Sequence, residues 1–399
     1  MFTKPEKVPE GQLPVEEVDV AVTKLSIRSL LCLIFLGYCP LLMSAVLPDD
    51  KVETLYHSYS GGGVEVTGPS VLVRKKFLDD FSVSANYYVD MVSSASIDVV
   101  TSASAYSEER TQYLLGLDYL NNNSRFALNY VNSSESDYEA NTASFKISQD
   151  FFSNLTNLAI GYSKGWDTVK KNGQSDFSKD ANRQNFRVDL TQVITKDFFM
   201  VLAVEAVTDE GFLNNPYRSV RYLDPTVVLG YSYQPELYPN TRTSSAVSIS
   251  GRYFLPYQAV IRSEYRWYQD TWGIDAQNIE LGYIQPYNDR LTLETNLRYY
   301  NQNQADFYAD LFPFQNAQNF LARDKELSAF HSISLGLGAN YQFPIHRLGF
   351  DKGRLSLFYN YFKFNYKNFH DLRVVTTPGE EPLYQFDADV LRFTAVFLF

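Results

Sequence analysis

The chain ends in the nine residues Leu391–Phe399 (LRFTAVFLF), which are mostly apolar. Counted back from the end, every second residue is apolar, and Arg392 and Thr394 stand between them. Successive side chains of a β-strand point to opposite faces, so this segment fits a strand with one lipid-facing side. A terminal aromatic residue on such a strand resembles the signal by which outer-membrane barrels are recognised for insertion. We predict that this signal consists of Phe393, Phe397 and Phe399.

The same period of two recurs along most of the chain beyond residue 60. In His331–Phe343, apolar residues alternate with Ser, Gly, Asn and Gln, and Arg290–Tyr300 shows a similar pattern. This alternation predicts strands with lipid on one face and a polar lumen on the other. Most segments reach the roughly 9–11 residues that a tilted strand needs to cross a bilayer. They lie near 64–77, 81–92, 110–120, 124–131, 142–150, 155–166, 185–194, 198–207, 244–254, 258–269, 277–285, 291–300, 328–343, 354–366 and 388–399.

The expected connections alternate between short turns and long polar loops, which is typical of outer-membrane barrels. Short turns are expected at 78–80, 121–123, 195–197, 255–257 and 286–289, and long loops at 93–107, 167–182, 208–242, 301–327 and 367–387. Fifteen strands cannot close a barrel whose two ends are both periplasmic, so Val52–Ser60 is assigned as a further strand. The strand-like Val227–Tyr233 then belongs to one extracellular excursion. We predict an all-β, antiparallel, up-and-down transmembrane barrel of sixteen strands, with fourteen or eighteen as alternatives.

Composition agrees with a barrel wall. The 399 residues include 30 Tyr and 29 Phe, and the mean hydropathy is −0.25. Barrel walls place aromatic residues at the membrane interfaces, whereas this hydropathy excludes a bundle of transmembrane helices. Residues 1–45 hold four of the 35 basic and five of the 46 acidic residues, so the rest of the chain has a net charge of −10. Such a charge argues against nucleic-acid binding.

The first 45 residues are interpreted as a signal peptide with an extended N-terminal region. Lys24 and Arg28 precede the apolar run Leu30–Leu42, and the small residues Ser44 and Ala45 follow it. A single membrane anchor is the alternative, although the run is short and contains a proline. Both cysteines of the chain lie in this segment, so the exported protein would hold no disulfide or thiolate site. Residues 46–63 are expected to be a short periplasmic segment or first strand, and 64–399 the barrel.

Several stretches resemble the DUF3570 family of predicted outer-membrane proteins. They are Gly61–Lys75 (GGGVEVTGPSVLVRK), Ser82–Asp98 (SVSANYYVDMVSSASID), Asp209–Asp224 (DEGFLNNPYRSVRYLD), Tyr238–Ser244 (YPNTRTS), Asp270–Asp275 (DTWGID), Ala305–Pro313 (ADFYADLFP) and Asn319–Ser328 (NFLARDKELS). The resemblance implies a barrel in the outer membrane and no particular activity. It also suggests a link to small lipoproteins and a redox or flavin-linked surface system, because family members often accompany such proteins.

No catalytic constellation, cofactor motif or metal site is expected from the residues. A barrel phospholipase would need His and Ser two positions apart on one strand. His57, His331, His346 and His370 are instead followed at that spacing by Tyr59, Ile333, Leu348 and Leu372. His370 with Asp371 is the pair that could serve a protease-like rim site. Four scattered histidines provide no metal-ligand spacing, and acidic loop pairs such as Asp209–Glu210 and Glu380–Glu381 are interpreted as solvated carboxylates.

Charged residues on the expected inner register are the first group of site candidates. Charges within the hydrocarbon zone must face water or one another, so they should line the interior. One interpretation is an electrostatic filter for a small solute, and the other is a salt-bridged ladder that fills the barrel. The candidates are Arg262, Glu264, Arg266, Glu294 and Arg298.

Two loops contain the second group of candidates. The first combines a proline-fixed turn with two arginines and aromatic residues, and the second mixes aromatic residues with balanced charge. A solvated loop does not need so many aromatic residues, so loop 301–327 is expected to fold inward or to pack against a neighbour. The candidates are Asn215, Tyr217, Arg218, Arg221, Asp306, Asp310, Arg323, Asp324, Lys325 and Glu326.

Taken together, these features favour a channel or conduit for a small solute in the outer membrane of a Gram-negative bacterium, exported through the general secretory route. The alternative is a scaffold that holds a lipoprotein or a redox-linked surface assembly, and an outer-membrane hydrolase is a third, weaker hypothesis. The expected partners are outer-membrane lipids, the barrel-assembly machinery during biogenesis and a small lipoprotein.

Overall fold

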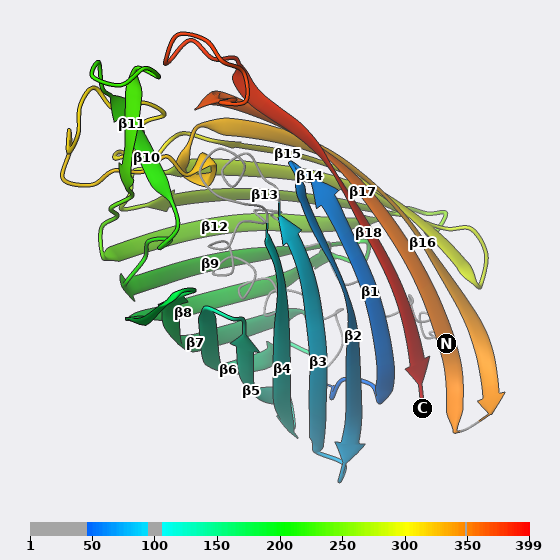
Figure 1. The fold of residues 1–399 in the computed structure, drawn as a ribbon. Coiled ribbons are helices and arrows are strands. Elements are labelled where there is room, and N and C mark those ends of the chain that lie inside the picture. The colour runs from blue at the N-terminus through cyan, green and yellow to red at the C-terminus, as the bar shows by residue number, and fades with distance from the viewer. Residues whose placement is uncertain (1–45, 95–105, 348) are drawn as a thin grey trace. The chain divides into compact units, whose positions relative to one another are not determined.

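Sixteen antiparallel strands close into a barrel within residues 46–94, 106–347 and 349–399, which are the residues described by the computed structural model (Figure 1). They are β1 (Lys51–Gly61), β2 (Val64–Phe77), β3 (Phe81–Ser94), β4 (Tyr106–Asn121), β5 (Ser124–Ser134), β6 (Tyr138–Phe151), β7 (Thr156–Lys171), β8 (Gln174–Thr195), β9 (Phe198–Gly211), β12 (Thr241–Phe254), β13 (Val260–Asp270), β14 (Asp275–Pro286), β15 (Leu291–Gln302), β16 (Phe330–Arg347), β17 (Phe350–His370) and β18 (Leu383–Leu398). The sixteen-strand prediction is confirmed, and the alternatives of fourteen and eighteen are wrong.

The first and last strands close the barrel. Every residue of β1 pairs with β18 on one side and β2 on the other, from Lys51 opposite Leu398 to Gly61 opposite Ala388. The strand assigned at Val52–Ser60 is therefore real. Closure removes both sheet edges, so all strands can satisfy their backbone groups within lipid.

The two faces of the wall differ as the alternation predicts. Large apolar side chains such as Leu335, Leu337 and Leu297 are exposed on the outside. Charged side chains occupy the opposite register, and the ion pair between Arg266 of β13 and Glu205 of β9 reaches across the intervening β12. The concave side favours such a bridge because its side chains converge, and together with the apolar outer face it identifies the lumen.

The connections at one end of the barrel are short, and those at the other end include three long excursions. The excursion between β9 and β12 contains a small separate sheet, β10 (Ser219–Leu223) with β11 (Tyr231–Pro235). Because β9 pairs directly with β12, this region is one excursion as predicted. The strand-like segment Val227–Tyr233 is mostly turn, and only its last three residues belong to β11.

One expected loop is wrong. Residues 167–182 belong almost entirely to β7 and β8, which continue to a tight turn at Asn172–Gly173. Gly173 has a φ of +82°, a conformation that glycine adopts without steric cost. Polar residues misled the prediction, because a strand that extends beyond the membrane faces water on both sides and loses its alternation.

Some expectations fall outside the described residues. The signal peptide at 1–45 and most of the loop expected at 93–107 belong to this group. Among the described residues, no helix has the length and apolar character needed to span a bilayer, and the helical element found there is the single turn η1 (Lys325–Leu327).

The C-terminal aromatic residues lie at the end of the barrel where both termini of the wall meet. Phe393 is exposed on the outer face, while Phe397 and Phe399 pack against the ring of Phe350 at 5.6 and 5.5 Å. Their role as an insertion signal stays a prediction.

Candidate functional site

All five predicted lumen residues occupy the inward-facing register, and most lie in polar contacts. The Arg262 guanidinium is 2.8 Å from Glu280, and that of Arg266 is 3.1 Å from Glu205. Arg298 donates a 2.7 Å hydrogen bond to Asn278. The carboxylate of Glu294 accepts a hydrogen bond from the Asn340 side chain. Glu264 stands opposite Glu280 in the strand register. Their function as a filter stays a prediction.

More ion pairs line the same face than the sequence analysis singled out. They join Arg125 to Asp118, Lys146 and Arg187 to Asp189, Arg183 to Asp209, and Arg242 to Asp270, with closest distances between 2.5 and 3.2 Å. All of these residues have inward parity on their strands. Applying the alternation to every strand, rather than to β13 and β15 alone, would have found them.

A further polar group braces the first strands of the barrel. His57 of β1 lies 2.7 Å from the Asp90 carboxylate of β3 and stacks on Tyr88 with ring centroids 5.0 Å apart. Asp90 also pairs with the buried Arg110 of β4. The brace crosses β2 at Gly68, where an added Cβ would lie 3.2 Å from the His57 ring and would overlap the Val89 backbone carbonyl.

The inner face of β17 and β18 is mainly aromatic, although Arg354 and Arg392 share its inward register. Phe364 and Phe386 stack at 4.6 Å with nearly parallel rings, and Phe362, Tyr366 and Tyr384 continue the cluster. These rings turn their faces toward one another, and four of the five are buried. This sector is therefore packed, whereas the charged sector opposite is hydrated.

Three excursions form a structured unit, which we call the cap (residues 212–240, 303–329 and 371–382). Its small apolar core consists of Val220 from the first excursion and of Phe312 and Leu321 from the second. Figure 1 shows β10 and β11, the gold loop after β15 and the red loop after β17 at the same end of the barrel. The third excursion is joined to the other two by charge.

Arg221 is the centre of this charge network. It is fully buried, donates from Nε to the Asp310 carbonyl at 2.9 Å, and pairs with the carboxylates of Asp310 and Glu381. Arg323 binds the other oxygen of Asp310 at 2.9 Å, and His370 Nδ1 lies 3.0 Å from the same carboxylate. Since these residues come from all three excursions, the network ties the cap into one body.

The electrostatics of the network follow from its pairing. Burial alone would raise the pKa of Asp310, but the Arg323 and Arg221 guanidiniums outweigh it and hold the pKa below its ordinary value. The same balance of burial against Arg221 lowers the pKa of Glu381. The carboxylates are therefore charged at neutral pH, and each has a guanidinium partner.

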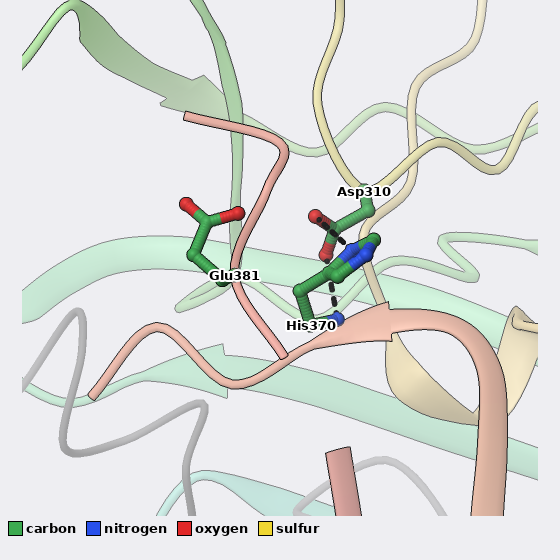
Figure 2. A group of neighbouring side chains, drawn as sticks. All are labelled: Asp310, His370 and Glu381. Carbon is green, nitrogen blue, oxygen red and sulfur yellow. Dashed lines mark hydrogen bonds and ion pairs between the residues drawn. The ribbon is translucent and has the colours of Figure 1, made fainter. Parts of the chain in front are cut away.

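Asp310, His370 and Glu381 also lie close enough together to be considered as metal ligands (Figure 2). Two guanidiniums already occupy the carboxylate oxygens and balance their charge. A cation would have to displace Arg221, so these residues fit a salt-bridge lock better than a metal centre.

A second lock joins the first two excursions. Arg218 binds Asp324 at 2.7 Å. Beside them, the buried Glu236 accepts hydrogen bonds from the Tyr238 hydroxyl at 2.6 Å and the Arg323 backbone N–H at 2.7 Å. Burial raises the pKa of Glu236 to about 7, although Arg218 acts in the opposite direction.

We expect the cap to become less stable as pH rises through about 7. Because the pKa of Glu236 is raised from 4.5, the folded cap binds a proton that an unfolded cap has released. This contribution is complete below pH 4.5 and is lost above about 7. Thermal melting followed by near-ultraviolet circular dichroism at pH 5.5 and pH 8 measures it. Glu236→Gln should remove the difference in melting temperature between the two pH values. If the difference persists in this variant, another titrating group causes it.

The remaining predicted loop residues lie in or beside the cap. Asn215 accepts from the Tyr217 backbone at 2.8 Å, and the Tyr217 hydroxyl donates to Asp137 at 2.6 Å. Lys325 is buried in η1, and Asp306 is exposed. Glu326 interacts electrostatically with Tyr59 of β1, and Gln302 donates to its carbonyl at 2.8 Å.

The sequence identified Arg218, Arg221, Asp310, Arg323 and Asp324 as candidates in two loops. It did not predict which of them would pair. It did not select Glu236, Tyr238, His370 or Glu381 as partners in this network. Asp209 and Glu381 were interpreted as solvated loop carboxylates, which is wrong, because they are buried against Arg183 and Arg221. No local pattern marks such residues, since their partners are up to 160 positions away.

A family model described as "Protein of unknown function (DUF3570)" matches residues 101–373. The resembling stretches Gly61–Lys75 and Ser82–Asp98 lie outside that range. A search of curated proteins gave no match.

Several solved structures share a loose likeness to the fold. A loop-deletion mutant of OmpT, an outer membrane protein of Vibrio cholerae, is 11% identical with a TM-score of 0.41, over 88% of this chain and 98% of that one. A bacterial polysaccharide outer membrane secretin is 8% identical with a TM-score of 0.47, over 88% and 100%. The siderophore receptor PirA from Acinetobacter baumannii is 10% identical with a TM-score of 0.43, over 85% and 57%.

Proposed function

The chain belongs to the DUF3570 family of proteins of unknown function, and from this premise we propose that it is an outer-membrane channel for a small polar solute. The observation that carries the proposal is the hydrated, charged inner wall of a closed barrel. Lys146, Arg187 and Arg266 are each at least a quarter exposed, although they lie on the concave face. A barrel filled only for stability would bury such groups.

The cap supports a selective conduit rather than a wide pore. It is folded around its own apolar core and salt-bridge network, and its η1 turn is hydrogen-bonded to Gln302 at the end of β15, 2.8 Å from the Glu326 carbonyl. An ordered loop that reaches the wall narrows a lumen more reproducibly than a mobile one does. The outer-membrane location is supported by the exposed apolar belt and by barrel closure.

Conductance of the purified protein in planar bilayers tests this proposal. We expect stable, ion-selective openings, because water reaches charged side chains along the lumen. Heat-modifiable gel migration establishes in the same preparation that the barrel is folded. A folded protein that adds no conductance over control bilayers would contradict a channel function.

A scaffold function is the second candidate, and one observation favours it. The turn between β10 and β11 exposes Val228 and Leu229, while Val375 of the third excursion is also almost fully exposed. Exposed apolar residues on ordered loops are typical of surfaces that bind a protein partner such as a small lipoprotein. Co-purification of one lipoprotein, lost on changing Val228 and Leu229 to Ser, would support this function.

A further inference from the structure

The ion pairs of the lumen share an asymmetry between their two members. In the pairs of Arg125, Lys146, Arg183, Arg187, Arg242 and Arg266, the cationic side chains are 22–41% exposed, whereas their carboxylate partners are 0–15% exposed. Two other inner pairs, those of Arg110 and Arg262, have members of similar exposure. Wherever the two members of one of these pairs differ in exposure, the more exposed member is thus the cation.

The asymmetry has a simple geometric cause. An arginine or lysine chain extends further from the backbone than an aspartate or glutamate chain, so the cation lies over its partner and reaches into the lumen. The carboxylates of Glu205, Asp209 and Asp270 consequently lie against the wall. A solute in the lumen meets guanidinium and ammonium groups first, and the six cations share five carboxylates, since Lys146 and Arg187 both pair with Asp189.

The cations also form a continuous series along one side of the barrel. Strand pairing connects Lys146 of β6 through Gly161 of β7 to Arg187 of β8, and Arg187 stands opposite Glu205 of β9. Arg183 and Arg242 flank Asp209, which lies two inward-facing positions beyond Glu205 toward the cap. The aromatic sector of β17 and β18 is packed and offers no comparable hydrated path.

We propose that this cationic series is the solute path of the channel and that it selects small anionic solutes carrying a carboxylate, phosphate or sulfate group. The inference rests on the proposed function and adds its substrate class. Guanidinium groups bind such oxyanions with two parallel hydrogen bonds. The net charge of the whole chain is negative, so its overall charge would suggest the opposite preference.

Charged thiol reagents test the sign of the lumen without requiring conductance. Ser248 lies on the inner face of β12, directly opposite Arg266 in the register. In a chain with Cys32 and Cys39 changed to Ser, Ser248→Cys is reacted with methanethiosulfonates that carry a sulfonate or a trimethylammonium group. Relative to free cysteine, we expect the anionic reagent to react about tenfold faster than the cationic one, since charged clefts enrich counter-ions by at least that factor.

The double change of Arg187 and Arg266 to Gln should reduce this preference to near unity. Arg373→Gln is the matched control, because Arg373 is an exposed arginine of the cap outside the series. A faster cationic reagent, or equal rates, would overturn the proposal, and so would failure of both reagents to reach Ser248→Cys in folded protein.

Reversal potentials separate the two proposals. In a KCl gradient, anion-selective openings whose selectivity falls in the Arg187 and Arg266 variant support the anionic solute. Cation-selective openings would overturn the proposed substrate class but would still support a channel function. An absence of openings overturns the channel, and the thiol reagents still determine the sign of the lumen.

Discussion

Replacing Arg221 by Leu is expected to open the cap while leaving the barrel folded. The change leaves Asp310 and Glu381 buried without their shared cation, and breaking a buried pair in this way costs about 3–5 kcal/mol. Arg323 and Lys325 are buried in the wild-type cap, and only 9% of the Arg218 side chain is exposed. Trypsin should therefore cut after these residues only in the variant, and mass spectrometry of the fragments identifies the sites.

Arg373→Leu provides the control for this prediction. Its partner is Asp371, but the guanidinium is half-exposed, and exposed ion pairs contribute only about 0–1 kcal/mol. The digestion pattern inside the cap should then stay that of the wild type. Combining Arg221→Leu with Glu381→Gln should restore part of the protection, because Asp310 keeps Arg323 as its partner and no uncompensated carboxylate is left. An Arg221→Leu cap that resists trypsin as well as the wild type would show that the network does not hold it.

Replacing Gly68 by Ala is expected to have the largest effect on the barrel itself. A Cβ at this position would overlap the Val89 backbone carbonyl oxygen and lie 2.7 Å from its carbon, so the neighbouring strand must move. Pairing between β2 and β3 is interrupted here, with Thr67 opposite Met91 and Ser70 opposite Tyr88. We expect a loss of about 3 kcal/mol or more, at the upper end of overpacking costs, measured by urea unfolding in detergent micelles.

Gly161→Ala is the matched control for that change. Gly161 also faces inward within a strand, but a Cβ there would meet its nearest atoms at 4.0 Å, which is ordinary van der Waals contact. Its effect should stay within about 0.5 kcal/mol of zero. Equal destabilisation by the two substitutions would mean that loss of glycine, and not the close approach of Val89, matters at Gly68.

The barrel was largely predictable because its determinant is local. A period of two is written into each strand, and the bilayer requires every strand to repeat it with similar length. Parity then supplied β1, since two periplasmic termini demand an even number of strands. The rule failed at 167–182, where β7 and β8 leave the membrane and no longer have one apolar face.

The site was predictable only in part, because only some of its determinants are local. Inward parity placed Arg262 and Arg266 in the lumen, because charged residues in a membrane wall can face only inward. It could not show which partner each would find, as Glu205 lies 61 positions before Arg266. The cap shows the limit more clearly: the charges of loop 301–327 were visible, but its lock depends on Arg221 and Glu381, 160 positions apart.

The sequence by itself thus determined the closed barrel, the direction of its strands from Leu391–Phe399 backwards, and the inner face, because lipid imposes these features residue by residue. Only the tertiary structure decided that the excursions fold into a cap, that Glu236 is buried there, and that cations cover their carboxylate partners in the lumen. These properties depend on distances between residues far apart in the chain and on side-chain reach, and alternation along a strand encodes neither.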